Sequence, residues 1–224
     1  MLILSHRGYH EEVPENTQEA FELALSLGVD GLETDVRLSA DGLPILFHDR
    51  VVPDGREVSS VSRRDLSRIM GYEVPTLDSV IKTWQDAFWN IEIKVPEALA
   101  ATVSVVSQYA MSTRFLISSF WHPVVKEFCR TVDVDGGILI AHHPLNFSSL
   151  LADLSTDSKL KTIIWDYEVL DPDLLQLANQ KGISNFVYGA LTKDEHRRLN
   201  GLDIHGVITD RPQFLSGIST SGAI

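Results

Sequence analysis

The sequence predicts an α/β protein, a (β/α)8 TIM barrel that carries an extra β-hairpin after its second strand. Short apolar runs alternate with amphipathic stretches along nearly the whole chain, and these patterns are typical of strands and helices respectively. Eight strands that alternate with helices indicate a closed parallel barrel. A flavodoxin-like open sheet is the alternative, but such a sheet normally needs only about five or six strands.

The individual elements follow from these patterns. The first helix is expected to begin at Thr17, whose side chain can cap a helix N-terminus, and to end at Gly28. Strands are expected at 2–6, 31–36, 88–94, 115–118, 137–141, 162–165, 185–188 and 206–209. Helices are expected at 17–27, 77–85, 96–111, 123–132, 146–154, 172–181 and 193–199.

One apolar run, 43–47, does not fit the alternation. It follows the second strand after only four residues, which is too short for a parallel crossover. Asp41-Gly42 lies between the two apolar runs, and this dipeptide indicates a hairpin. A turn centred between Ala40 and Asp41 would pair residues whose numbers sum to 81. That register places His48 opposite Glu33, at the C-terminal rim where barrel enzymes carry out their chemistry.

Composition restricts the classes of function. A chain of 224 residues, 44% of them hydrophobic, can bury one sizeable core, so we predict one domain over 1–215 and a flexible tail at 216–224. The single cysteine, Cys129, suits a reducing compartment, and the chain has neither a leader-like N-terminus nor a membrane-length apolar run. We therefore expect a cytoplasmic protein. The net charge of −12 argues against nucleic acid or an anionic membrane as the main partner.

Carboxylates occur within two of the predicted strands. Glu33 and Asp35 are two residues apart, so on a strand they point to the same face. Glu92 and Lys94 repeat this spacing on the next barrel strand. A carboxylate in an apolar strand is costly unless it is paired, protonated or bound to a metal. Because Glu33, Asp35 and Glu92 offer only hard oxygen ligands, Mg²⁺ or Ca²⁺ is expected rather than zinc.

A second reading makes these carboxylates purely structural partners of Arg7, Arg37 and Lys94. Two histidines favour the metal site instead. His6 ends the first strand and His48 ends the hairpin, so both are expected on the same rim. A phosphodiester needs a base for the attacking oxygen and an acid for the leaving alkoxide, and two imidazoles can supply them. The pattern indicates a metal-assisted reaction on an anionic small molecule.

With these residues in place, the chain resembles the glycerophosphodiester phosphodiesterase family. The resemblance extends from Leu4 to Phe214. Its motifs, in order, are His6-Arg7-Gly8, Pro14-Glu15-Asn16-Thr17, Gly31-x-Glu33-x-Asp35-Val36, Asp41-Gly42, His48-Asp49, Pro75-Thr76-Leu77, Glu92-Ile93-Lys94, Ser118-Ser119-Phe120 and Thr209-Asp210-Arg211-Pro212.

The resemblance implies hydrolysis of glycerophosphodiesters to glycerol 3-phosphate and an alcohol. It implies a divalent metal on Glu33, Asp35 and Glu92, with His6 and His48 as general acid and base. It also implies that Arg7 and Lys94 hold the phosphoryl oxygens and that Asn16 orients the site.

The sequence departs from the family pattern where the substrate is held. After His48-Asp49 the family usually has a leucine and then an Arg-Thr-Thr segment, whereas here residues 50–55 are shorter and have no threonine. In place of a Trp-Thr-Val-Asn run the chain has Tyr188-Gly189-Ala190-Leu191. Tyr188 can still form an apolar wall for glycerol.

Three alternatives are left open. A lysophospholipase D-like enzyme would need an exposed apolar rim, and the main insertion, Arg50–Gly71, is polar and charged. A catalytically silent phosphate-binding barrel would lack a histidine or a metal ligand, and none is missing. A sugar-phosphate isomerase would not explain the paired histidines.

Overall fold

The computed structural model describes residues 1–215. The predicted tail, 216–224, lies outside the described residues, so the domain boundary at 215 stays a prediction. The strands are β1 (Leu2–Ser5), β2 (Gly31–Leu38), β3 (Pro44–Leu46), β4 (Phe88–Ile93), β5 (Phe115–Ser119), β6 (Asp135–Ile140), β7 (Leu160–Asp166), β8 (Ser184–Tyr188) and β9 (Gly206–Thr209).

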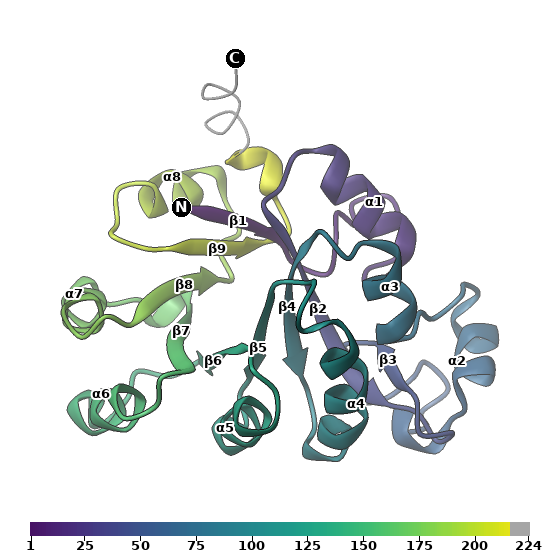
Figure 1. Cartoon of the computed structure of the whole chain (residues 1–224). Helices are drawn as coiled ribbons and strands as arrows, with labels where there is room; N and C mark the ends of the chain where they lie inside the picture. The colour runs from purple at the N-terminus through teal and green to yellow at the C-terminus, as the bar shows by residue number, and fades with distance from the viewer. Residues whose placement is uncertain (216–224) are drawn as a thin grey trace.

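The strands close into a barrel with the helices around it (Figure 1). Parallel pairing runs from β1 through β2, β4, β5, β6, β7 and β8 to β9, and β9 pairs with β1 again. The short β3 is antiparallel and extends the sheet from β2 outside this ring. The predicted TIM barrel is therefore confirmed.

The helices lie close to their expected positions. Thr17 caps α1 by accepting a hydrogen bond from the backbone N–H of Ala20, as its place before an amphipathic run predicts. Pro96 opens a short 3₁₀ turn (Pro96–Ala98) ahead of α4, where a continuous helix was expected. The helices are α1 (Gln18–Ser26), α2 (Arg63–Met70), α3 (Leu77–Thr83), α4 (Leu99–Tyr109), α5 (His122–Thr131), α6 (Phe147–Ser155), α7 (Pro172–Gln180) and α8 (Lys193–Leu199). No helix within residues 1–215 is long and apolar enough to cross a membrane.

Apolar side chains fill both the inside of the barrel and the layer between strands and helices. Trp89 and Trp165 are fully buried in that outer layer, and Trp165 donates a hydrogen bond from Nε1 to Asn185 Oδ1 over 2.8 Å. Its expected role in the core is therefore correct. The barrel interior contains Leu4, Phe88, Leu116, Leu139, Ile164, Phe186 and Ile208. Because this packing closes the barrel below its mouth, the polar residues are concentrated at the C-terminal rim.

The hairpin exists, but the register predicted for it is wrong by one residue. Val36 pairs with Leu46, so paired numbers sum to 82 (36 + 46) and not to 81. Ser39 and Leu43 close a turn of three residues, in which Gly42 has a φ of 75° and donates to the carbonyl of Ser39. Such a turn ends in a left-handed residue and adds one residue to the two-residue loop. His48 is therefore not opposite Glu33 in the ladder.

The insertion after the hairpin forms its own small unit. Helix α2 presents Leu66 to a cluster that includes Val52, Val58, Val61 and Val74. This cluster packs on the outer face of β3, next to Ile45. The polar composition of the insertion therefore reflects its solvent-facing side, and its apolar residues are buried.

Candidate active site

A pocket of about 210 Å³ lies at the mouth of the barrel. Its walls come from the C-terminal ends of most of the barrel strands, which is where enzymes with this fold place their catalytic groups. It is lined by His6, Arg7, Glu33, His48, Asn90, Glu92, Lys94, Ser118, Phe120, Leu139, Tyr188 and Ile208. Of the sequence-predicted site residues, only Asp35 and Asn16 are missing from this lining, and both lie directly behind it.

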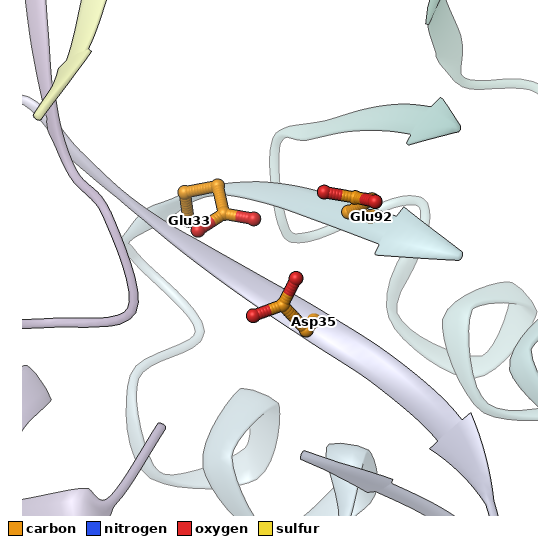
Figure 2. Close-up of side chains that lie close together, drawn as sticks. All are labelled: Glu33, Asp35 and Glu92. Atoms are coloured by element: carbon orange, nitrogen blue, oxygen red, sulfur yellow. The ribbon is translucent and has the colours of Figure 1, made fainter. Parts of the chain in front are cut away.

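The three predicted metal ligands meet at the polar side of this pocket (Figure 2). Glu33 and Asp35 project from β2, and Glu92 projects from β4, where it pairs with Asp35 across the parallel ladder. One carboxylate oxygen of each lies within 4.8 Å of the others. All three side chains are buried. The spacing of two residues along a strand thus brings the carboxylates together as predicted.

Asp35 is the most fully compensated of the three. Arg7 Nε lies 3.0 Å from its Oδ2 and Lys94 Nζ lies 3.3 Å from its Oδ1. Burial alone would raise the pKa of Asp35, but the charges of Arg7 and Lys94 outweigh it and lower that pKa. Asn16 Nδ2 also donates to Oδ2 over 3.0 Å. Asp35 is therefore ionised, and its position is fixed.

Asn16 holds a strained backbone conformation in order to make these contacts. Its φ is 56°, in the left-handed region that non-glycine residues rarely adopt. Its Oδ1 accepts hydrogen bonds from Thr34 Oγ1 over 2.7 Å and from the backbone N–H of Asp35 over 3.3 Å. The side chain thereby joins the loop after β1 to β2. This placement agrees with a role in orienting the site.

At Glu33 and Glu92 the surroundings do not fully compensate a negative charge. Burial, together with the neighbouring charge of Asp35, raises the pKa of Glu33 to about 8. Burial and Asp35 also raise the pKa of Glu92, although Lys94 Nζ lies 2.7 Å from its Oε1. Structural ion pairs therefore account for Asp35 and only partly for Glu92, whose pKa stays raised beside Lys94. Among the described residues Glu33 has no lysine or arginine within ion-pair distance, and its charge is left unexplained.

The excess of negative charge at the three carboxylates suits a divalent cation. Among the described residues three carboxylates face two cations: Arg7 contacts Asp35, and Lys94 contacts both Asp35 and Glu92. A divalent ion would supply the missing positive charge and let all three carboxylates ionise. Oxygen donors at this spacing suit Mg²⁺ or Ca²⁺, which bind oxygens at about 2.0–2.6 Å. The acidic triad can therefore bind a metal ion.

His6 lies beside the triad and is held from behind. Its Nδ1 is 2.6 Å from Asp210 Oδ1, and its Nε2 is 3.8 Å from Glu33 Oε2. Burial lowers the pKa of His6, but Glu33 and the hydrogen bond to Asp210 outweigh this effect and raise it. Because Asp210 occupies Nδ1, the nitrogen that faces the pocket is Nε2. A carboxylate in this position fixes the tautomer and the orientation of an imidazole.

Asp210 and His10 are the site residues that sequence reasoning missed. His10 Nε2 lies 3.1 Å from the same Asp210 oxygen. Burial raises the pKa of Asp210, but its bonds to His10 and His6 outweigh that effect and lower it strongly. The available signal was the Thr209-Asp210 motif that ends the last strand. In a closed barrel this strand lies next to the first one, which ends at His6.

His48 reaches the pocket even though the register was wrong. The backbone N–H of Phe47 still donates to the carbonyl of Asp35 on β2. His48 follows directly, and Arg37 Nε donates to its carbonyl over 2.7 Å. Arg37 therefore supports the hairpin end and does not pair with a carboxylate of the triad. His48 Nδ1 lies 2.9 Å from Asp49 Oδ1, and the side chain lines the pocket with His6. The two histidines are thus brought together at one mouth.

The opposite side of the pocket is apolar. Tyr188 at the end of β8 lies edge-on to Phe120, with ring centroids 6.3 Å apart. Burial, and then the nearby Asp166, raise the pKa of Tyr188 far above its usual range, so this phenol stays neutral. Leu139 and Ile208 complete the wall. Tyr188 therefore occupies the place expected of an apolar wall.

Comparison with known proteins identifies the family. The model of the glycerophosphoryl diester phosphodiesterase family matches residues 6–133 and 137–214. The chain therefore belongs to the glycerophosphoryl diester phosphodiesterase family, as the sequence resemblance predicted, and the enzyme class that goes with it, a phosphoric diester hydrolase, is confirmed.

Individual relatives agree with this assignment along nearly their whole length. The chain is 26% identical to a glycerophosphodiester phosphodiesterase of Caldanaerobacter subterraneus, with 99% of this chain and 98% of that protein covered. A probable glycerophosphodiester phosphodiesterase 2 of Mycobacterium tuberculosis is 27% identical, with 97% and 90% covered. The crystal structure of a glycerophosphodiester phosphodiesterase from Thermotoga maritima superposes with a TM-score of 0.86 at 26% identity, over 97% of this chain and 98% of that one.

The raised pKa of Glu33 predicts a pH dependence of stability in metal-free protein. Because its folded pKa of about 8 exceeds the unfolded value, Glu33 contributes stability below about pH 4 that is lost as the pH rises through about 8. In EDTA, the melting temperature of Glu33→Gln minus that of the wild type should therefore be larger at about pH 8.5 than at about pH 5.5. A gain of 1 kcal/mol corresponds to roughly 2–4 °C.

The measurement is thermal unfolding followed by circular dichroism at both pH values. Glu12→Gln, which removes a carboxylate on the exposed loop after β1, is the matched control and should show no such change. An equal difference between Glu33→Gln and wild type at both pH values would contradict the buried, repelled carboxylate described above.

Proposed function

We propose that the protein hydrolyses glycerophosphodiesters to glycerol 3-phosphate and an alcohol. One observation carries this proposal: three close carboxylates, two cationic side chains and two histidines line or adjoin a single pocket of a size suited to glycerol phosphate. A phosphodiesterase from Oleispira antarctica with the same fold, at a TM-score of 0.85 and 23% identity, was crystallised in complex with its product sn-glycerol-3-phosphate. Release of the alcohol from glycerophosphocholine, glycerophosphoethanolamine and glycerophosphoglycerol tests the proposal.

Glu33, Asp35 and Glu92 would hold one Mg²⁺ or Ca²⁺ ion. When bound, such an ion polarises a phosphoryl oxygen and stabilises the charge that develops on it. Arg7 and Lys94 flank the same carboxylates and add positive charge where the anionic phosphate enters. This local charge offsets the net charge of −12, which would otherwise repel an anionic substrate.

The two histidines would transfer the protons. One deprotonates the attacking oxygen and the other protonates the leaving alkoxide. Asp210 holds Nδ1 of His6, which leaves Nε2 to exchange a proton with the substrate. Asp49 can orient His48 through its Nδ1 in the same way.

The attacking oxygen is inferred to be the 2-hydroxyl of the substrate. This hydroxyl is adjacent to the phosphoester, and intramolecular attack gains effective concentration. One histidine removes its proton, the oxygen bonds to phosphorus, and the bond to the alcohol breaks as the other histidine protonates it. Water then opens the cyclic glycerol phosphate to glycerol 3-phosphate. The apolar wall at Tyr188 and Phe120 can cover the carbon face of the glycerol.

We further propose a cytoplasmic location, supported by the single cysteine, Cys129, which cannot form an internal disulfide. The partner is then a small glycerophosphodiester and no nucleic acid. The short segment 50–55 and Leu191 offer fewer polar contacts than the family pattern, so a weak KM and a loose choice of head group are expected.

Metal removal should abolish turnover. Exhaustive EDTA treatment is expected to stop alcohol release, and Mg²⁺ or Ca²⁺ should restore it better than Zn²⁺ because all three ligands are carboxylates. Glu92→Gln should raise the metal concentration that gives half-maximal activity and should leave cooperative unfolding intact. Glu97→Gln, which removes an exposed carboxylate in the 3₁₀ turn just after β4, is the control. Full activity after chelation would refute the metal site.

Replacing either His6 or His48 should remove most of the turnover rate. His6→Ala and His48→Ala are each expected to lower kcat by about 10²–10⁴-fold, the usual contribution of general acid–base catalysis. Because both act on one displacement, the double variant should lose far less than the product of the two effects. His143→Ala, an exposed histidine on the same rim, should retain kcat. A His48→Ala enzyme with normal kcat would remove His48 from the mechanism.

The cyclic intermediate can be tested with an analogue that lacks the 2-hydroxyl. We expect this analogue to bind and to resist cleavage, while the parent compound shows a transient cyclic phosphate by ³¹P NMR. If the analogue is cleaved as fast as the parent, and ¹⁸O from water enters in a single step, water attacks phosphorus directly.

A further inference from the structure

Asp210 accepts hydrogen bonds from two histidines through a single oxygen. Its Oδ1 lies 2.6 Å from Nδ1 of His6 and 3.1 Å from Nε2 of His10. Burial would raise the pKa of Asp210, but these two bonds lower it strongly, so the group is an ionised carboxylate. Because a carboxylate can only accept, both nitrogens carry a proton and donate it to this oxygen. His10 is not among the described residues that line the catalytic pocket, so its effect on the reaction must pass through Asp210.

The side chain of Asp210 depends on the two imidazoles for its orientation. It is 40% exposed, and it directly follows the last residue of β9. Within residues 1–215 no other side chain or backbone group donates a hydrogen bond to it. The adjacent Thr209 hydroxyl is bonded to His196 and to the N–H of Arg211 instead. A partly exposed carboxylate with one partner can rotate toward water, and a second donor to the same oxygen restricts that rotation.

The loop that carries His10 is itself tied to the chain beyond β9. Glu11, next to His10, forms an ion pair with Arg211, next to Asp210. Glu11 Oε1 also accepts from Gln213 Nε2 over 3.1 Å. These contacts cross the line where β1 and β9 pair in register. The imidazole of His10 therefore donates to Asp210 from a position that the neighbouring ion pair fixes.

We propose that His10 is a positioning residue, whose Nε2–H holds the Asp210 carboxylate where it accepts the Nδ1–H of His6. This inference rests on the proposed function, in which Nε2 of His6 exchanges a proton with the substrate. A carboxylate bonded to Nδ1 fixes the tautomer and the direction of an imidazole ring. Loss of His10 frees Asp210, and His6 then spends less time with Nε2 toward the pocket.

A role confined to structure would have different consequences. The side chain of His10 is 24% exposed, and it could simply join the two loops, as Glu11 does. Loss of such a contact would lower the free energy of unfolding, whether or not the new residue can donate a hydrogen bond. A positioning role instead requires a donor in the place of Nε2. It also lowers kcat without raising KM, because the residues that contact the substrate are unchanged.

The test compares three variants, with glycerophosphocholine as substrate and choline release as the readout. His10→Phe keeps a planar ring and removes the donor. We expect its kcat to fall by about tenfold at an unchanged KM, the low end of what loss of a supporting hydrogen-bond partner costs at metal sites. His10→Gln places an amide N–H near the position of Nε2 and should restore most of the lost kcat. His143→Phe, which removes the imidazole of a separate histidine–aspartate pair on the rim, is the matched control and should keep kcat.

Two further measurements separate this role from misfolding and from failure of the proposed function. In an Asp210→Asn background, His10→Phe should add no further loss, because it acts through Asp210. The proton of the short His6–Asp210 hydrogen bond gives a downfield ¹H NMR resonance, which should persist in His10→Gln and disappear in His10→Phe. This signal requires no turnover. No choline release by the wild type would therefore refute the proposed function, while the NMR comparison would still decide whether His10 holds Asp210.

His10→Ala removes the donor by truncation and should show the same loss, so it replaces His10→Phe if the larger ring prevents cooperative unfolding. Equal losses in His10→Gln and His10→Phe would overturn the proposal, because the donor would then be irrelevant. A further loss in the Asp210→Asn background would overturn it too, as would a raised KM at normal kcat. A normal kcat with an unchanged resonance in His10→Phe would show that Asp210 needs no second donor. An equal effect of His143→Phe would show that the loss is unspecific and would also overturn the proposal.

Discussion

The repulsion between three buried carboxylates is the constraint on which the rest of this mouth depends. Glu33, Asp35 and Glu92 come within 4.8 Å of one another through strand geometry alone. Arg7, Lys94 and Asn16 then gather around Asp35, and His6 lies near Glu33. Even so, the pKa of Glu33 remains raised by burial and by Asp35. The polar half of the rim is thus an arrangement that a cation would complete.

The rim divides into two halves with different chemistry. The ends of β1, β2 and β4, with the hairpin, supply the charged groups, and β5, β6 and β8 supply Phe120, Leu139 and Tyr188. A phosphodiester of glycerol has the same division, since its phosphate is anionic and one face of its glycerol consists of C–H groups. The charged half of the rim therefore matches the phosphate, and the apolar half matches the carbon face of the glycerol.

Most of the fold and the acidic triad could be predicted from the sequence because both rest on local periodicity. Alternation of strands with helices gives the barrel, and a spacing of two residues gives the shared face of Glu33 and Asp35. The hairpin register failed because Gly42 adopts a positive φ and lengthens the turn by one residue, which Asp-Gly alone does not reveal. Asp210 was missed because its partner His6 is 204 residues away.

Barrel closure explains why a contact of such range is nevertheless constrained. The first and last strands of an open sheet need not meet, whereas β1 and β9 pair in register here, with Ser5 opposite Thr209. The residues that follow them, His6 and Asp210, must therefore be neighbours at the rim. Once the barrel is recognised, Asp210, just after the last strand, can therefore be inferred to be the partner of His6, just after the first strand.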